Sequence, residues 1–150
     1  MPRKMTDKEP IGVRAAAARF RAALEQGGLS LASLANFPSG ACGDTSEMLG
    51  QYLQDCGLGT WLYRSHMIPP SHAWIEREGW IVDITADQFD SITEAVIVTQ
   101  DRQWHDQRFP SAPGRRPANM DWFDTNLVGA GARADYQTLR ARAEGSALIG

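Results

Sequence analysis

The sequence predicts an α+β fold in which N-terminal helices pack on a small antiparallel sheet. Apolar residues follow a helical spacing early in the chain and a strand-like alternation in its middle, so helices precede strands. The 150 residues are 43% hydrophobic and 22% charged, which is typical of one globular domain. We expect residues 1–9 to form a disordered tail and residues 10–150 to form this single domain.

The first two helices are indicated by apolar spacing and by their ends. The first is expected over 11–26, because its apolar residues recur every three or four positions and two glycines follow it. A short helical turn is expected over 29–37. The second helix is expected over 43–56, where acidic residues in the first turn suit the positive end of the helix dipole. Its apolar face consists of Met48, Leu49, Tyr52, Leu53 and Cys56.

Strands are expected in the middle of the chain, where aromatic and β-branched residues are frequent. A proline pair, Pro69–Pro70, ends the first of them. The segment 103–124 is rich in Pro, Asp and Trp and predicts irregular structure, whereas an Ala- and Arg-rich final helix is expected over 132–148. The expected strands are 60–68, 72–77, 80–85 and 95–99.

A tight hairpin between the second and third strands predicts which side chains share a face. With Glu78–Gly79 as a two-residue loop, Trp74 lies opposite Asp83. Because side chains alternate, one face is apolar and faces the core, while the other places His72 diagonal to Asp83 and within its reach. A loop longer or shorter by one residue would put Asp83 on the opposite face. The apolar face consists of Ala73, Ile75, Val82 and Ile84.

Cys42 stands at the start of the second helix, in the run FPSGACGD. A helix N-terminus stabilises an anion through its N–H groups and its dipole, so a thiolate nucleophile gains most at this position. The flanking Gly40 and Gly43 leave room for a substrate carbonyl, and the N–H of Cys42 or Gly43 is available to an oxyanion. With His72 as base and Asp83 orienting it, the sequence predicts a Cys–His–Asp triad.

The order of these residues resembles the transglutaminase-like branch of the papain-like cysteine hydrolases. The resemblance covers about residues 37–89 and lies in Cys42 at a helix start, followed by His-Ala-Trp-Ile-Glu and Ile-Val-Asp-Ile-Thr on successive strands. It implies a papain-like α+β fold with Cys42 as nucleophile, His72 as general base and acid, and Asp83 as orienting carboxylate.

The chain differs from this family in length and in its oxyanion donor. It is shorter than typical transglutaminases and peptidases, and no glutamine upstream of the cysteine matches a papain-style donor. Asn36 and Gln88 are therefore the candidate side-chain donors, besides the N–H of Gly43. Trp74 shares the face of His72, where it either lines the substrate pocket or packs in the core.

Other cysteine, histidine and acidic residues have structural interpretations. Cys56 continues an apolar helix face and is expected in the core, and about 21 Å of helix separates it from Cys42, too far for a disulfide. His66 is an alternative base, whereas His105 is expected at the surface, and Asp87 and Gln88 are expected to cap the turn that follows them. The arginine-rich terminal helices are expected to present solvated faces. No metal site is expected, because neither CxxC nor HxxxH occurs.

These observations predict a cysteine-dependent enzyme that cleaves an amide or peptide bond through a thioester. Hydrolysis by a peptidase, amidase or protein deamidase is the first expectation, because a small domain has little with which to exclude water. The alternatives are a transglutaminase or other amine acyltransferase, and an inactive papain-like binding module. A peptide or protein substrate and no cofactor are expected.

Charge and hydropathy argue against other classes of partner. The net charge is −3 and no basic stripe is present, so a nucleic-acid partner is not expected. No apolar run approaches the roughly 18 residues of a membrane span. The charged N-terminus lacks the apolar stretch of a signal peptide, which makes the cytoplasm the expected compartment.

Overall fold

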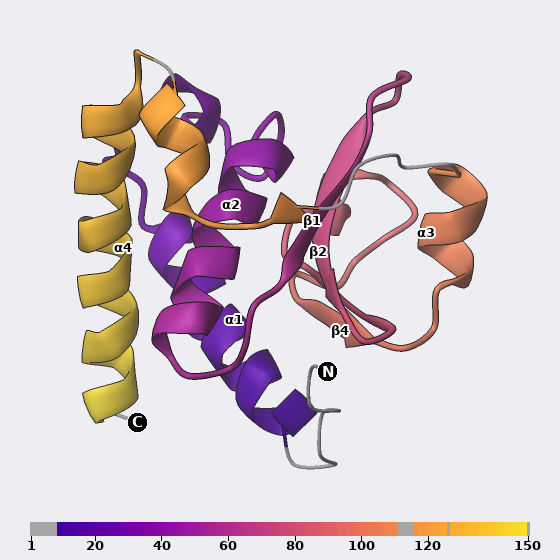
Figure 1. Ribbon diagram of the computed structural model, residues 1–150, viewed down its shortest axis with the longest axis horizontal. Helices are drawn as coiled ribbons and strands as arrows, with labels where there is room; N and C mark the ends of the chain where they lie inside the picture. Colours follow the sequence, from indigo (N-terminus) through magenta and orange to yellow (C-terminus); the bar gives the residue numbers. More distant parts are fainter. Residues whose placement is uncertain (1–8, 111–115, 126, 150) are drawn as a thin grey trace.

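The computed structural model describes residues 9–110, 116–125 and 127–149, and its elements form successive layers (Figure 1). Helix α4 (Gly129–Ile149) lies outermost and packs against α1 (Glu9–Glu25). Helices α1 and α2 (Cys42–Asp55) cover one face of the sheet, and the short helix α3 (Gln103–Arg108) lies on the other face. The expected α+β arrangement of helices on a small antiparallel sheet is confirmed.

Among the described residues, the strands form one five-stranded sheet in the order β4-β3-β2-β1-β5. Every neighbouring pair is antiparallel. The central position of β2 places its residues under cover on both faces, and five of its six residues are buried. The strands are β1 (Leu62–His66), β2 (His72–Arg77), β3 (Trp80–Asp83), β4 (Ile97–Thr99) and β5 (Arg116–Pro117).

The hairpin between β2 and β3 has the expected two-residue loop. Arg77 pairs with Trp80 and Ile75 pairs with Val82, so only Glu78 and Gly79 lie between the strands. Both loop residues have positive φ, 51° and 85°, which is typical of the primed turns that match strand twist. This register puts His72 and Asp83 on the same face of the sheet.

The two faces of the sheet are covered differently. The face toward the helices is aliphatic: Ile75, Val82 and Ile84 belong to the main core together with residues of α1, α2 and α4. The opposite face is aromatic, since Trp74 and Ile81 pack with Phe109 and with the partly buried rings of Phe89 and Trp104. The expected apolar core face is therefore confirmed for these three residues.

The segment 103–124 is not irregular as expected, because it contains α3, β5 and η3 (Met120–Thr125), while residues 111–115 lie outside the described part. Helix α3 has only six residues, too few to display a helical period in sequence. The expected turn over 29–37 contains η1 (Ala32–Leu34). Glu9, expected in the tail, is the first residue of α1.

The expectations for Cys56, Arg21 and Asp87 are wrong. Helix α2 ends at Asp55, so Cys56 lies beyond its apolar face and is exposed. Arg21 is buried rather than solvated, and its guanidinium donates to both carboxylate oxygens of Asp87, at 2.7 and 2.8 Å. Asp87 therefore pairs with α1, and this pair holds the 3-10 turn η2 (Ala86–Gln88) that follows β3.

A close backbone contact joins α2 to the segment after β5. A methyl group at Gly50 would lie 2.3 Å from the carbonyl oxygen of Ala118, so this segment can lie against α2 only because position 50 has no side chain. The N–H of Ala118 also donates to the carbonyl of Trp61 at 2.8 Å. In the described part of the chain, no helix has the length and apolar character required to cross a membrane.

Candidate active site

Cys42 is the first residue of α2, one residue earlier than the expected helix start. The preceding residue, Ala41, makes no side-chain cap to the N–H groups of the first turn. The helix N-terminus is therefore open to an anion at this cysteine. Cys42 is half-buried and lines a cavity of about 140 Å³. The cavity lining consists of Cys42, Gly43, Tyr63, Ser65, Met67, Ser71, His72 and Ala73.

His72 and Asp83 form a buried hydrogen-bonded pair. The N–H at Nε2 of His72 donates to Oδ2 of Asp83 at 2.6 Å, and neither side chain is exposed to solvent. The other carboxylate oxygen, Oδ1, accepts the backbone N–H of Thr85 at 3.0 Å. Because Nε2 is bound to Asp83, Nδ1 is the ring nitrogen left for proton exchange with Cys42.

The electrostatics of the pair favour charge on both members. Burial alone lowers the pKa of His72, but hydrogen bonds with Asp83 and Cys42, and their charges, outweigh it and raise the pKa from 6.5 to about 9. Burial alone raises the pKa of Asp83, whereas hydrogen bonds from His105 and His72 hold it well below its ordinary value. The Cys42 side chain therefore lies close enough to the imidazole to stabilise its protonated form.

Aromatic rings enclose the imidazole of His72. The ring centroids of Phe89, Phe109 and Trp74 lie 5.0, 5.1 and 5.6 Å from that of His72, respectively. The Phe89 ring meets the imidazole edge to face, with an interplanar angle of 88°. Such a cage keeps water from the His72–Asp83 hydrogen bond and so strengthens it.

The other predicted site residues are only partly brought together. Gly43 lines the cavity, but Asn36, Gln88 and Trp74 do not. Asn36 is exposed in the turn before α2. The Gln88 amide nitrogen lies 3.4 Å from Nδ1 of His72 and donates to the Thr85 carbonyl, and Trp74 is buried behind the imidazole. Gln88 thus contacts the base rather than the cavity, and Trp74 packs in the aromatic cluster.

The alternative base, His66, does not contact Asp83 in the described structure. It pairs with His72 across β1 and β2, and its Nδ1 lies 3.0 Å from the carbonyl oxygen of Pro110. His66 is therefore bound at the end of the sheet, apart from the carboxylate that could orient it.

Sequence reasoning missed two residues of the site. His105 was expected at the surface, but it is buried, and its Nε2 donates to Asp83 Oδ2 at 2.8 Å. Tyr63 lines the cavity beside Cys42, and its hydroxyl lies 3.4 Å from where a methyl group at Gly43 would stand. The burial of His105 had one available sequence signal, which is that aromatic residues, Trp104 and Phe109, lie near it in an otherwise polar segment. No sequence signal pointed to Tyr63.

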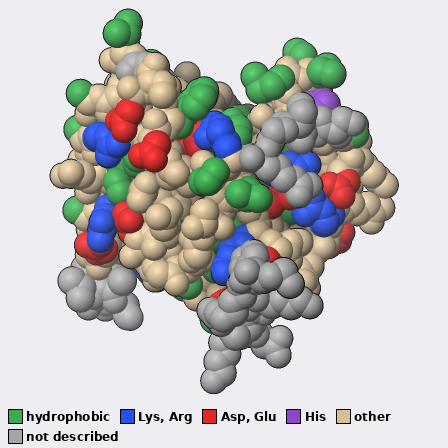
Figure 2. Space-filling model, in the orientation of Figure 1, with side chains coloured by type: hydrophobic (Ala, Val, Ile, Leu, Met, Phe, Trp, Pro, Cys, Tyr) green, Lys and Arg blue, Asp and Glu red, His purple; other side chains and the backbone are tan. Residues whose placement is uncertain are grey.

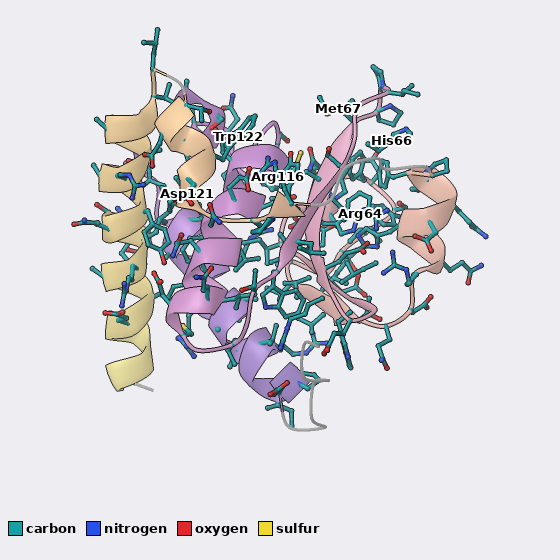
Figure 3. The ribbon with its side chains drawn as sticks, viewed as in Figure 1. Arg64, His66, Met67, Arg116, Asp121 and Trp122 are labelled. Carbon is teal, nitrogen blue, oxygen red and sulfur yellow. The ribbon has the colours of Figure 1, made fainter. Side chains whose placement is uncertain are left out.

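Apolar and aromatic side chains lie at the edge of the site. Met67, which lines the cavity, is exposed at the outer end of β1, whereas Trp122 lies with η3 (Figure 3). The Arg116 guanidinium lies 4.4 Å from the ring centroid of Tyr63 and 4.5 Å from that of Trp122, and it pairs with the buried Glu47. Figure 2 shows the surface hollowed between the η3 side and the projecting tip of the β1–β2 connection.

His72, Asp83 and His105 are also the one group among the described residues whose donor atoms could hold a metal ion, since these atoms lie within 4.8 Å of one another. Two ligands bound about 2.0–2.2 Å from a tetrahedral zinc ion stand more than ~3 Å apart. The observed nitrogen-to-oxygen distances of 2.6 and 2.8 Å are instead those of charge-assisted hydrogen bonds. The arrangement therefore fits proton binding between imidazoles and carboxylate better than metal coordination.

The site is thus a cysteine at a helix N-terminus, beside an imidazole that is bound to a buried carboxylate. This combination is suited to nucleophilic catalysis with proton transfer. Comparison of the chain with protein-family models, with curated proteins and with solved structures found no match.

Proposed function

We propose that this protein is a cysteine-dependent acyl-transfer enzyme that hydrolyses an amide or peptide bond. The observation that carries the proposal is the position of His72, with Nε2 bound to Asp83 and the Cys42 side chain beside the same ring. The open N-terminus of α2 supports a thiolate at Cys42. A papain-like relationship is part of this proposal, supported by the order of Cys42, His72 and Asp83 along the chain.

The reaction proceeds in two stages. The Cys42 thiolate attacks the carbonyl carbon, and the resulting oxyanion collapses as the carbon–nitrogen bond breaks and the His72 imidazolium gives its proton to the leaving amine. This leaves an acyl thioester on Cys42. His72, now neutral, takes a proton from water, whose oxygen attacks the thioester carbonyl carbon. The carbon–sulfur bond then breaks, which releases the acid and restores the Cys42 thiolate and the His72 imidazolium.

The oxyanion has two sources of hydrogen bonds near Cys42. Backbone N–H groups of the first turn of α2 point toward the helix N-terminus. Burial, together with the neighbouring Glu47 and Cys42, raises the pKa of Tyr63, so its hydroxyl remains a donor. The cavity volume of about 140 Å³ is close to the ~150 Å³ that holds a benzene-sized group, which suits one side chain or a short acyl chain.

Selective alkylation tests whether Cys42 is activated. Cys56 is the more exposed of the two thiols, so exposure alone predicts that it reacts first. We expect iodoacetamide near pH 7 to modify Cys42 at least about tenfold faster than Cys56, because Cys42 is the thiol beside a helix N-terminus and an imidazolium. Peptide mass spectrometry measures both rates in the same sample.

Two variants complete this experiment. His72→Ala should slow Cys42 alkylation and leave Cys56 unaffected, whereas Cys56→Ser serves as the matched control and should retain the fast reaction. An activated acyl ester should leave its acyl mass on Cys42, and a labelled primary amine distinguishes hydrolysis from transamidation by whether the amine is incorporated. Faster labelling of Cys56 together with an unchanged rate in His72→Ala would refute the proposal.

A further inference from the structure

A second imidazole shares the buried carboxylate of the site. Oδ2 of Asp83 accepts Nε2–H of His72 at 2.6 Å and Nε2–H of His105 at 2.8 Å. With the Thr85 N–H on Oδ1, three donors hold the carboxylate. His105 is 2% exposed, and its ring lies 5.0 Å from Trp74 and 4.8 Å from Trp104, so its orientation is restricted by packing.

The short helix that carries His105 is itself attached to the sheet. Arg102, at the N-cap of α3, donates to Oε1 of Glu76 on β2 at 2.7 Å. Trp104 donates through its indole nitrogen to the Ser91 hydroxyl at 3.2 Å. Helix α3 is therefore bound at its start and along its length, which places His105 over Asp83 with little freedom.

We propose that His105 is a positioning residue, whose hydrogen bond keeps the Asp83 carboxylate ionised and directed at His72. This inference rests on the proposed function, because it adds a fourth member to the Cys42, His72 and Asp83 arrangement. The chemical reason is that a fully buried carboxylate tends to take up a proton unless enough donors satisfy it. His105 supplies a third donor to this carboxylate, in addition to His72 on β2 and the Thr85 N–H just after β3.

Other ionisable groups surround His105 and Asp83, and they remain the same in wild type and in the His105 variants. Cys42 approaches His72 from α2, and Glu76 is bound by arginines on the same face of the sheet. On its other side, His105 lines a cavity of about 330 Å³ with groups from α1 and from the segments before and after β4. The charged residues of that cavity are Arg14, Glu94 and Asp101.

The test compares His105→Gln with His105→Leu. The Gln amide can place a nitrogen donor near the position of the imidazole Nε2, whereas Leu removes the donor. We expect the acidic limb of the pH profile for Cys42 alkylation to move up by about one pH unit in His105→Leu, equivalent to about a tenfold slower reaction on that limb. His105→Gln should stay close to the wild-type profile. Rates near pH 8 should agree within about threefold in all three proteins, since Asp83 is ionised there.

Two further measurements keep the inference testable. If His105→Leu does not fold, His105→Asn is used, because its shorter amide does not reach Asp83 and should shift the profile in the same direction. NMR titration of the His72 ring protons reports protonation of Asp83 without any need for activity, so it separates this inference from the proposed function. An unchanged acidic limb and an unchanged His72 titration in a folded variant without the donor would overturn it.

Discussion

The two faces of the sheet differ in the kind of side chain against which their buried residues pack. Ile75 and Trp74 are neighbours in β2 and both are buried, yet Ile75 enters the main apolar core against the helices and Trp74 enters a cluster with ionisable groups. Aliphatic burial stabilises a fold directly, whereas buried charges cost free energy unless they are paired. The helix-facing side of the sheet therefore contributes mainly apolar burial, whereas the opposite side contains the buried, paired charges.

Glu76 pairs with two arginines on the second face, separately from the Asp83 site. Its carboxylate accepts from Arg64 at 2.9 Å, from Arg102 at 2.7 Å and from the Trp74 indole at 2.9 Å. Burial alone would raise the pKa of Glu76. Hydrogen bonds from Arg102 and Trp74, together with the charge of Arg64, outweigh this effect, so the pKa of Glu76 lies below its ordinary value. This network joins β1, β2 and α3 around the candidate site.

The largest expected effect comes from Asp83→Asn, which removes the charge at the centre of the second face. Breaking a buried ion pair costs about 3–5 kcal/mol of unfolding free energy, and in the proposed mechanism the loss of the orienting carboxylate lowers turnover by about 10⁴-fold. Chemical denaturation and acyl-ester hydrolysis measure the two losses. Wild-type turnover in this variant would remove Asp83 from the mechanism.

Ile75→Ala tests the helix-facing side in the same strand. The lost side chain leaves a cavity in the main core, and we expect the unfolding free energy to fall by about 3 kcal/mol. Cys42 alkylation by the folded protein should stay within about threefold of wild type, because Ile75 points away from His72. A loss of reactivity as severe as that of Asp83→Asn would show that the two faces are not separable.

A change of pH alone, without any substitution, is expected to lower the stability by an amount similar to that of Ile75→Ala. The pKa of His72 is about 9 in the folded protein and 6.5 in the unfolded chain, so its contribution to stability is complete below pH 6.5 and is lost as the pH rises through 9. Between these values we expect the unfolding free energy to fall by about 3 kcal/mol. Denaturation curves at pH 6 and pH 9.5 measure the change.

His72→Gln is the control for this pH effect, because Gln does not titrate. The fall in stability between pH 6 and pH 9.5 should be much smaller in this variant. A wild-type protein that becomes more stable over the same range would contradict the assigned direction of the His72 pKa shift.

The helix-facing side of the fold could be predicted from sequence because its signals are local and periodic. The spacing of apolar residues located α1 and α2, and the Glu78–Gly79 turn gave the register that places His72 with Asp83. Boundaries were less accurate: β3 ends at Asp83 rather than at residue 85, and α4 begins at Gly129 rather than at 132.

The opposite side could not be predicted as fully, because its cover comes from a distant, short segment. His105 follows Asp83 by 22 residues and belongs to a helix of six, so neither periodicity nor spacing relates the two. Arg21 was misjudged for a similar reason: its partner Asp87 is 66 residues away. Long-range pairing of polar groups decides their burial, and composition alone does not reveal it.

The contact at Gly50 has a practical consequence for protein engineering. Position 50 sets how closely the segment after β5 approaches α2, and that segment leads from Arg116, beside Tyr63, to Trp122. If the proposed enzyme is engineered for altered substrate preference, a library should therefore vary positions 116 and 122 and keep glycine at position 50. A larger side chain at position 50 would displace the segment that carries both of the varied positions.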